Sequence, residues 1–551
     1  MPTCGTKDKT LKLAFRIFTA LIAILAVLFS AQRLIRWTSH GVVYVSCDGG
    51  FLADGTSPSG AFRTIQQALD RAMPGDTIRI LDGVYNERLH LRRGGTDQTP
   101  LILEAANPGK VLVTWESPLA DAVSGGWHDE GDGIFSALTT WPIYRIHRDE
   151  QSLYRVVYGG LPQLQKLVRR AAAWDSFCYE SGRVYVWLSD GTMGKFAGLK
   201  THRRAPEPRE WGEFRAANLT IESSNVQIRG LRFEFGIGSS VMVMDADNVS
   251  ISDCSFFGAT YGVSTPSGHS AGQHVSLQKC LYHNYPQYGW RINWLSWAEI
   301  YVGYASSSLI GANADFVTVK DCVAVHFGDA VQVSNSGLSE SPQAELIGNF
   351  FALGTDDAFE IEGPAKNIAV RDNLVYECHE SLGLSPVELG PVTVTGNVFL
   401  HRKSGTNGAQ VKLINRDGED GVIQNIRIQN NLFVGDWLCW MAGKSRDVQI
   451  TGNSFVVFHQ ADPPWPMGVI ETDNLYFDRA ALTVRENVSP AESAPEIATG
   501  IQAAIHGNAA FKASLAVILH ASGPEWWNWK EHPATRDVST DIDDIRRELA
   551  R

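Results

Sequence analysis

Ten copies of a short pattern recur between Asn225 and Ser489, at intervals of 22 to 27 residues with three longer gaps. The copy at Asn225 reads Asn-Val-Gln-Ile-Arg-Gly-Leu-Arg-Phe, and the copy at Asn248 reads Asn-Val-Ser-Ile-Ser-Asp-Cys-Ser-Phe. Each copy alternates in polarity like a β-strand and then reaches a polar turn. A period of this length is typical of solenoids, in which one coil has no core of its own and must stack on its neighbours.

The seventh residue of each copy indicates what fills the coils. In chain order it is Leu231, Cys254, Cys280, Cys322, Asn349, Asn373, Asn397, Asn431, Asn453 and Asn487. Stacked asparagines can donate a hydrogen bond from each amide to the amide of the next coil. Cysteines at the same position are expected to be buried free thiols that act as small hydrophobic side chains. We therefore predict an all-β protein, a right-handed parallel β-helix with an asparagine ladder.

Residues 40–114 are predicted to form an N-terminal cap and the first coils. A helical face is formed by Phe62, Ile65, Leu69 and Ala72. Pro74-Gly75 ends this helix, and strand alternation resumes at Asp76. Here Phe62-Arg-Thr-Ile-Gln and Gly75-Asp-Thr-Ile resemble pectate-lyase-like β-helix proteins. That resemblance implies the fold, and one fold hosts many activities.

The remaining segments complete the predicted organisation. Residues 115–214 lose the repeat and alternate like short antiparallel strands with Asp-Gly turns, so we expect a β-rich insertion. Residues 215–490 carry the β-helix repeats. Residues 491–551 are expected to form a C-terminal capping segment, with Trp526-Trp-Asn-Trp covering the last coil.

The N-terminus predicts export. Ile17 to Ala31 is an uncharged run, preceded by four basic residues and followed by Arg33 and Arg36. Its length lies between that of a signal-peptide core and a full membrane span. The charge bias favours a short cytoplasmic segment at 1–16, a transmembrane anchor at 17–37 and a body in the periplasm or at the cell surface. A cleaved signal peptide, which would leave a secreted protein, is the alternative.

Bulk composition narrows the class of partner. The net charge of −12 and pI near 5.7 disfavour a nucleic-acid partner. The chain contains no P-loop, no dinucleotide fingerprint and no zinc-spaced Cys/His set, so we expect no organic cofactor. We expect a monomer.

Four successive coils align the strands Val331-Gln-Val, Phe359-Glu-Ile, Leu382-Gly-Leu and Val411-Lys-Leu. Their apolar ends point inward, so the middle residues form an outward column of Gln332, Glu360, Gly383 and Lys412. A second predicted column holds Ser334, Glu362, Ser385 and Ile414. A third holds Gly328, Asp356, His379 and Gly408. Coils lie about 4.8 Å apart, so one acidic patch with a histidine and a lysine is expected.

Carboxylates this close repel one another unless a cation or a proton compensates them. The predicted ligands of a Ca²⁺ ion are Asp357, Glu360, Glu362 and Gln332. The predicted catalytic residues are Lys366, His379, Lys412 and Asp356. A solvated acidic face is the alternative interpretation, because outward strand positions are normally polar.

Glu360-Ile-Glu362 followed by Lys366 resembles the Glu-x-Glu…Lys motif of polysaccharide lyase family six, which includes chondroitinase B and alginate lyases. The resemblance implies that the two glutamates bind Ca²⁺, which neutralises a uronate carboxylate, and that Lys366 is the base. This chain departs from the motif in two ways. Lys366 comes one residue early, and the next strand, Leu382-Gly-Leu-Ser385, lacks the arginine that serves as the acid.

The long gap between Cys280 and Cys322 is rich in aromatic residues, which can stack on sugar rings. We predict substrate-binding residues at Tyr288, Trp290, Arg291, His401 and Lys403. The alternative is that the aromatics form one face of a packed helix.

The sequence predicts a protein that acts on an extracellular polysaccharide, as a lyase or C5-epimerase of a uronate-containing glycan. Two alternatives stay open at this point. The first is a glycoside hydrolase, which needs only two carboxyl groups. The second is a non-catalytic surface solenoid that binds glycan or has a structural role.

Overall fold

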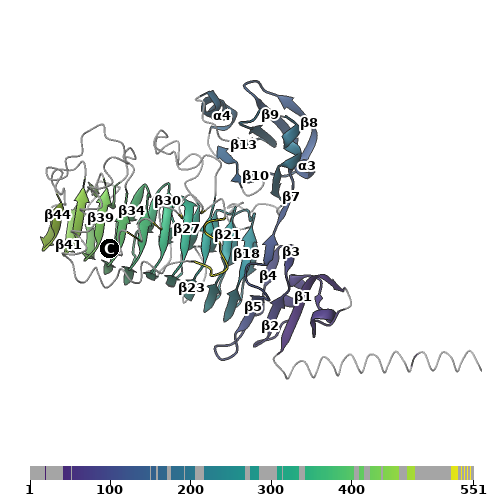
Figure 1. The fold of residues 1–551 in the computed structure, drawn as a ribbon, viewed down its shortest axis with the longest axis horizontal. Helices are drawn as coiled ribbons and strands as arrows, with labels where there is room; N and C mark the ends of the chain where they lie inside the picture. Colours follow the sequence, from purple (N-terminus) through teal and green to yellow (C-terminus); the bar gives the residue numbers. More distant parts are fainter. Residues whose placement is uncertain are drawn as a thin grey trace, which may run out of the picture.

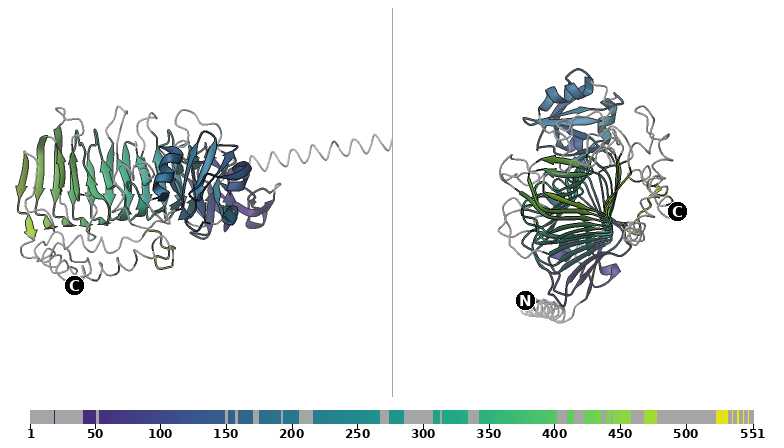
Figure 2. Two further views of the ribbon diagram at one scale, coloured as in Figure 1. Left: turned by 90° about the horizontal axis from the view of Figure 1, so that it is seen from above. Right: turned by 90° about the vertical axis from the view of Figure 1, so that its left-hand side faces the viewer.

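Three parallel sheets wind into a β-helix in the computed structural model (Figure 1). The structure describes residues 41–50, 53–148, 151–156, 159–169, 175–191, 193–204, 216–266, 274–284, 307–312, 314–333, 342–401, 409–414, 422–435, 439–442, 444–457, 468–477 and 523–531, with Thr19, Thr535, Ser539, Asp543 and Arg547. The central coils each contribute one strand to each sheet, and the three sheets enclose a single apolar core (Figure 2).

Sheet A has thirteen strands among the described residues. They are β1 (Val42–Gly50), β2 (Thr77–Ile80), β5 (Leu101–Ala105), β17 (Val226–Arg229), β20 (Val249–Ser252), β23 (His274–Gln278), β26 (Phe316–Lys320), β29 (Gln343–Ile347), β32 (Ile368–Arg371), β35 (Val392–Thr395), β38 (Val422–Gln429), β41 (Lys444–Thr451) and β43 (Val469–Thr472). Most of these strands alternate buried and exposed residues, which is the pattern of a sheet with one solvated face.

Sheet B has twelve strands in the described part of the chain. They are β3 (Gly83–Asn86), β6 (Val111–Thr114), β18 (Leu231–Glu234), β21 (Ser255–Phe257), β24 (Leu281–His283), β27 (Val323–Phe327), β30 (Phe350–Gly354), β33 (Leu374–Tyr376), β36 (Val398–Leu400), β39 (Leu432–Gly435), β42 (Ser454–Val457) and β44 (Leu475–Phe477). Many of these strands are buried on both faces.

Sheet C has ten strands over the same described ranges. They are β4 (Leu89–Leu91), β16 (Ala217–Ile221), β19 (Ser239–Val243), β22 (Tyr261–Thr265), β25 (Ser308–Ala312), β28 (Val331–Val333), β31 (Asp357–Ile361), β34 (Glu380–Gly383), β37 (Val411–Ile414) and β40 (Cys439–Ala442). The outward face of sheet C carries polar and charged residues, among them Gln332, Glu360 and Lys412.

The asparagine ladder lies at the turn between sheets A and B. Asn373 Nδ2 donates to Asn397 Oδ1 (2.8 Å), and Asn397 Nδ2 donates to Asn431 Oδ1 (2.9 Å). The predicted cysteines continue the ladder as buried free thiols, which is confirmed for Cys254, Cys280 and Cys322. After Asn453 the ladder differs from its prediction. The next rung is Asn474, because β43 and β44 form a further coil that the sequence pattern did not predict. The predicted rung Asn487 lies outside the described residues.

The cap helix α2 (Ile65–Leu69) is shorter than the predicted face, but Phe62, Ile65, Leu69 and Ala72 are all buried in the main core. A single turn η1 (Pro58–Gly60) precedes it. The Thr64 side chain caps the helix by accepting from the Gln67 amide (3.1 Å). The helix thereby covers the open end of the first coils.

Residues Glu116 to His202 leave the solenoid and form two small sheets that stand above the first coils (Figure 1). Their elements are β7 (Glu116–Pro118), α3 (Leu119–Ala122), β8 (Val123–Asp129), β9 (Ile134–Thr139), β10 (Ile146–Arg148), β11 (Gln151–Ser152), β12 (Tyr154–Val156), α4 (Gly160–Arg169), β13 (Ser176–Glu180), β14 (Arg183–Trp187), η2 (Met193–Gly198) and β15 (Lys200–His202). The insertion docks through the His147 ring, which stacks on Phe235 at 3.6 Å, and through Arg145, which donates to Thr260.

The C-terminal segment was predicted to cover the last coil, but its described part lies elsewhere. Trp526 Nε1 donates to the Asp253 carbonyl (2.9 Å), and the Trp529 ring packs against Phe350. These partners belong to coils in the middle of the solenoid, so the tryptophans lie along its side (Figure 2). They cover apolar side chains of sheet B.

The predicted membrane anchor at 17–37 lies outside the described residues, apart from Thr19. In the part of the chain that the structure describes, no helix has the length and apolar character needed to cross a bilayer.

Candidate active site

The outward column predicted on sheet C is confirmed by the strand register. Gln332 pairs with Glu360, Glu360 with Gly383, and Gly383 with Lys412. On β31 the residues on either side of Glu360, Phe359 and Ile361, are fully buried in the core. Glu360 is therefore held on the outer face by the packing of its two neighbours.

The neighbouring column differs from the predicted one by one residue. Ala358 and Phe359 are consecutive and both lie in the core, so the strand bends between them and turns Asp357 outward. Asp357 pairs in register with Glu380 of the next coil, and its backbone N–H donates to Asp329 Oδ1 (3.1 Å) of the previous coil. The second outward column is therefore Asp329, Asp357 and Glu380, in place of Asp356 and His379.

Lys412 crosses between the two columns. Its Nζ lies 2.5 Å from Asp357 Oδ2 and 2.9 Å from Glu380 Oε2, and all three side chains are buried. Burial alone would lower the pKa of Lys412, but Asp357 first and then Glu380 outweigh it and raise that pKa above its ordinary value. Lys412 is therefore held protonated as the counter-ion of the cluster.

Gly383 leaves the space that the Asp357 carboxylate occupies. A Cβ atom at Gly383 would lie 2.5 Å from Asp357 Oδ2 and 2.6 Å from its Cγ. The sequence predicted a hollow at this glycine, and the structure fills it with Asp357. Only glycine lets Asp357 extend toward Lys412.

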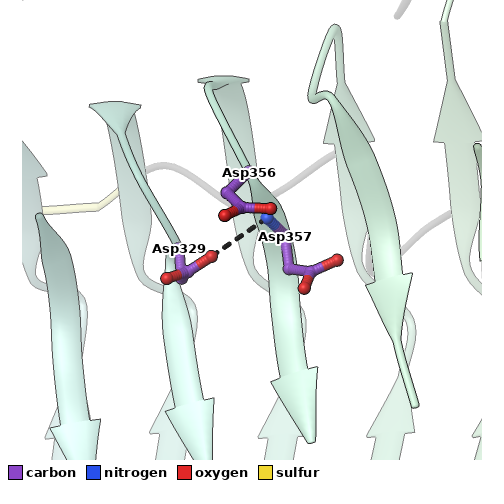
Figure 3. Close-up of side chains that lie close together, drawn as sticks. All are labelled: Asp329, Asp356 and Asp357. Carbon is purple, nitrogen blue, oxygen red and sulfur yellow. Dashed lines mark hydrogen bonds between the residues drawn. The ribbon is translucent and has the colours of Figure 1, made fainter. Parts of the chain in front are cut away.

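Three carboxyl groups come together at the start of β31 (Figure 3). One oxygen from each of Asp329, Asp356 and Asp357 lies within 4.8 Å of the others. Gln332 Nε2 donates to Asp329 Oδ2 (2.7 Å), so its amide nitrogen faces the cluster. We call Asp329, Asp356, Asp357, Glu360 and Glu380, with Lys412, the carboxyl cluster.

Several acids of the carboxyl cluster hold their protons tightly. Burial, and after it the charges of Glu362, Asp357 and Asp356, raise the pKa of Glu360 to about 8. Burial and the charge of Asp357 raise the pKa of Glu380 to about 9. Burial and then the charge of Glu360 raise the pKa of Asp329 well above its usual range. At neutral pH the cluster therefore contains protonated carboxyl groups beside the ion pair of Lys412.

The predicted histidines lie beside this cluster. His379 is 8% exposed, and burial lowers its pKa. The charge of Asp357 raises that pKa by a smaller amount, and the charge of Lys412 lowers it further. His401 is buried on the next coil, 3.9 Å from the Glu377 carboxylate, and burial lowers its pKa to about 4. Both rings are neutral at neutral pH, so His379 can accept a proton there.

Other predicted residues lie elsewhere or outside the described residues. Lys366 is exposed at the turn toward sheet A, and its described contact is a backbone hydrogen bond to Pro342. Within the described residues no contact brings its side chain to the cluster. Glu362 is half-buried just beyond β31, and its charge raises the pKa of Glu360. Tyr288, Trp290, Arg291 and Lys403 fall outside the described residues.

Three residues near the cluster were absent from the predicted set, namely Asp329, Glu380 and Tyr261. Asp329, Asp357 and Glu380 occupy equivalent positions at the starts of their strands, and that alignment of successive coils is the signal that could have found Asp329 and Glu380. The Tyr261 ring lies over Gly311, whose Cβ would come 2.5 Å from Tyr261 Cε1. Burial and then the charges of Asp329 and Glu360 raise the pKa of Tyr261 to about 12.

The first coils match the family model of chondroitinase B over residues 60–135. This segment contains the cap helix, the strands β2 to β6, which belong to the three sheets, and the start of the insertion. A curated relative, the uncharacterized protein YwoF of Bacillus subtilis strain 168, is 31% identical over 124 residues. That match covers 21% of this chain and 25% of the relative, so the chain spans about a quarter of the length of the relative.

Solved structures with similar coils include enzymes of more than one kind. The complex of XylC with xylose has a TM-score of 0.40 at 11% identity and covers 78% of this chain and 86% of that one. A mannuronic acid specific polysaccharide family 6 lyase from human gut microbiota has a TM-score of 0.35 at 12% identity, with coverages of 88% and 96%. At these scores the structural similarities carry no argument about activity. The N-terminal coils match a polysaccharide lyase family, and the chemistry must be argued from the carboxyl cluster.

Proposed function

We propose that the protein cleaves a uronate-containing polysaccharide by β-elimination, with the carboxyl cluster on sheet C as its active site. The observation that carries the proposal is the charge balance of the cluster. Five carboxyl groups meet a single described cation, Lys412, which is already paired with two of them. Such a site accepts an acidic sugar only with additional positive charge or with protons on its carboxyl groups.

The residues present fit a hard cation. Oxygens of Asp329, Asp356 and Asp357 converge, and Asp357 Oδ1 is buried without a hydrogen-bond partner. We propose these three as Ca²⁺ ligands, with Glu362 as a further oxygen donor. When bound, Ca²⁺ would supply positive charge that stabilises the charge developing at the uronate carboxyl group.

The protein's own groups supply the proton transfers that elimination requires. His379, neutral and buried beside Asp357, is proposed to accept the proton from C5 of the uronate at an imidazole nitrogen. Glu360 and Tyr261 both hold a proton at neutral pH and are the proposed donors to the leaving glycosidic oxygen. Lys412 acts through Asp357 and Glu380 by fixing the position of their carboxylates. Reprotonation at C5 from the opposite face would make the same site an epimerase.

Hydrolysis is the second candidate, and a specific observation favours it. Lys412 cannot serve as a base while the Asp357 carboxylate holds it protonated, and Lys366 makes no described contact with the cluster. A protonated Glu360 close to the carboxylate of Asp357 is instead the acid and base pair that glycosidases use. A neutral glycan would then be the substrate.

The deciding experiment measures both products from the full-length protein. A panel of alginate, chondroitin, pectate and xylan is incubated with Ca²⁺ or with a chelator, and unsaturated uronate ends and reducing ends are measured together. A calcium-dependent rise in ultraviolet absorbance supports elimination. Reducing ends without unsaturation support hydrolysis. Neither product from any glycan would contradict both proposals and favour the non-catalytic solenoid.

Two variants locate the activity. Glu360→Gln removes the proposed proton donor and is expected to lower kcat by about 10²-fold or more. Glu345→Gln is the matched control, because Glu345 is an exposed outward glutamate on β29 in the coil that contains Glu360. If both variants keep full activity, the carboxyl cluster is not the active site.

A further inference from the structure

Arg88, just before β4, is a partly buried cation without an anionic partner. Its Nε atom is buried and makes no hydrogen bond, and no carboxylate in the described ranges pairs with its guanidinium. Burial lowers the pKa of Arg88, and no neighbouring carboxylate offsets that effect. Its guanidinium lies 5.4 Å above the ring of Trp115 at the base of the insertion. A desolvated, unpaired charge is costly, so its retention indicates a ligand.

Other polar atoms next to Arg88 also lack partners. Leu89 pairs with Leu219 and His90 pairs with Thr220, so Arg88 and Asn218 lie at the same level on neighbouring strands. Asn218 is fully buried and its Oδ1 accepts no hydrogen bond. Thr220 is 1% exposed with an unpartnered Oγ1, and His90 Nδ1 is buried without a partner. Buried polar atoms in proteins are normally satisfied, so four together mark a site.

This group shares a sheet face with the carboxyl cluster. Thr220 lies between inward-facing Leu219 and Ile221, so it points outward as Glu360 does. Six strand steps along sheet C separate β4 from β31, which corresponds to about 29 Å. Arg92 lies at the same end and is paired with Glu222, whose Oε2 is 3.5 Å from Arg92 Nε. Among the described residues, Arg88 therefore supplies the unpaired positive charge at the first coils of this face, whereas the carboxyl cluster is acidic.

We propose that Arg88, with His90, Asn218 and Thr220, forms a distal subsite that binds the anionic group of an acidic sugar residue in the polysaccharide. A planar guanidinium matches a carboxylate or sulfate with two parallel hydrogen bonds. The amide and hydroxyl groups bind the hydroxyls of the same sugar. The subsite deepens the proposed function, and it requires a substrate long enough to reach from the cluster to the first coils.

The test measures binding to the full-length protein by calorimetry. The probes are alginate decasaccharides, chondroitin sulfate decasaccharides, acidic disaccharides and a neutral xylan decasaccharide. Arg88→Gln is expected to weaken binding of the acidic decasaccharides about tenfold or more, the loss of one charged hydrogen-bonding contact. Binding of the neutral decasaccharide should not change. Arg79→Gln is the control, because Arg79 on sheet A is paired with Glu104 at 2.7 Å.

Each outcome decides the proposal. Unchanged binding by Arg88→Gln would overturn it, as would a wild-type protein that binds none of the acidic probes. A larger loss with alginate assigns a carboxylate to the subsite, and a larger loss with chondroitin sulfate assigns a sulfate. Thr220→Val keeps the volume and removes only the hydroxyl, so weaker binding by this variant supports the subsite even if Arg88→Gln folds poorly.

The subsite can fail independently of the active site. Asp357→Asn is expected to abolish turnover while the acidic decasaccharides still depend on Arg88 for binding. Arg88→Gln should also unfold at the same or a higher temperature than the wild type, because it removes a desolvated charge. A marked drop in Tm together with unchanged glycan affinity would assign Arg88 a structural role instead.

Discussion

Glycine at two outward positions of sheet C makes room for a functional side chain from a neighbouring coil. The Asp357 carboxylate extends over Gly383, and the Tyr261 ring lies over Gly311. A side chain at either glycine would push these groups away from the carboxyl cluster. The geometry of the cluster therefore depends on residues that contribute no chemistry of their own.

Gly383→Ala is expected to abolish most of the activity and to cost about 1–3 kcal/mol of unfolding free energy. The added methyl would overlap Asp357 Cγ at 2.6 Å and force its carboxylate away from Lys412. Activity assays and urea denaturation measure the two effects. Gly126→Ala is the control, since its Cβ would meet nothing within 4 Å. Wild-type activity in Gly383→Ala would show that the position of Asp357 is unimportant.

Single residues also mark where prediction from the sequence succeeds and fails. Strict alternation placed Glu360 and Lys412 correctly, because both lie inside regular strands. The same rule placed Asp356 and His379 in the column that Asp357 and Glu380 occupy, because the bend at Ala358 puts two consecutive residues into the core. Alternation holds within a strand and breaks at its first residue, where the carboxyl cluster lies.

At the scale of elements, the asparagine ladder connects the coils that carry the cluster. Each asparagine side chain in the ladder hydrogen-bonds to the coils on both sides of its own coil. Asn397 Nδ2 donates to the Val370 carbonyl (2.9 Å) and to Asn431, while its Oδ1 accepts from the Asn373 backbone N–H (2.9 Å). The ladder was predictable because its period repeats in the sequence. The exact coil lengths were not, since Asn474 follows Asn453 through a coil whose strands depart from the repeat pattern.

Asn397→Ala is expected to destabilise the protein by about 3 kcal/mol or more, because it leaves several buried donors and acceptors unsatisfied. The midpoint of urea denaturation measures the loss. Asn107→Ala serves as the control, because Asn107 is exposed and its side chain hydrogen-bonds only to exposed Asp82 in the described contacts. Equal urea midpoints for the two variants would show that the hydrogen bonds of the ladder do not stabilise the fold.

Across the whole molecule, buried histidines and buried glutamates make the free energy of unfolding depend on pH in opposite directions. Burial lowers the pKa of His202 to about 4 and that of His326 to about 3. Below about pH 6.5 the unfolded chain binds protons that these folded histidines reject, so stability falls as the pH falls. Glu360 and Glu380, with pKa values of about 8 and 9, keep protons that the unfolded chain releases above about pH 4.5. Their contribution is lost as the pH rises toward 9.

Stability is therefore expected to be greatest at intermediate pH and to fall on both sides, and denaturant midpoints measured across the pH range test this. His326→Asn should reduce the loss of unfolding free energy at acid pH by up to about 4 kcal/mol, because it removes a buried group whose folded pKa lies far below 6.5. Asparagine tolerates the positive φ of 57° at this position. His128→Asn, at an exposed histidine of β8, should leave the acid side unchanged. An equal shift in both variants would mean that the acid sensitivity arises elsewhere in the chain.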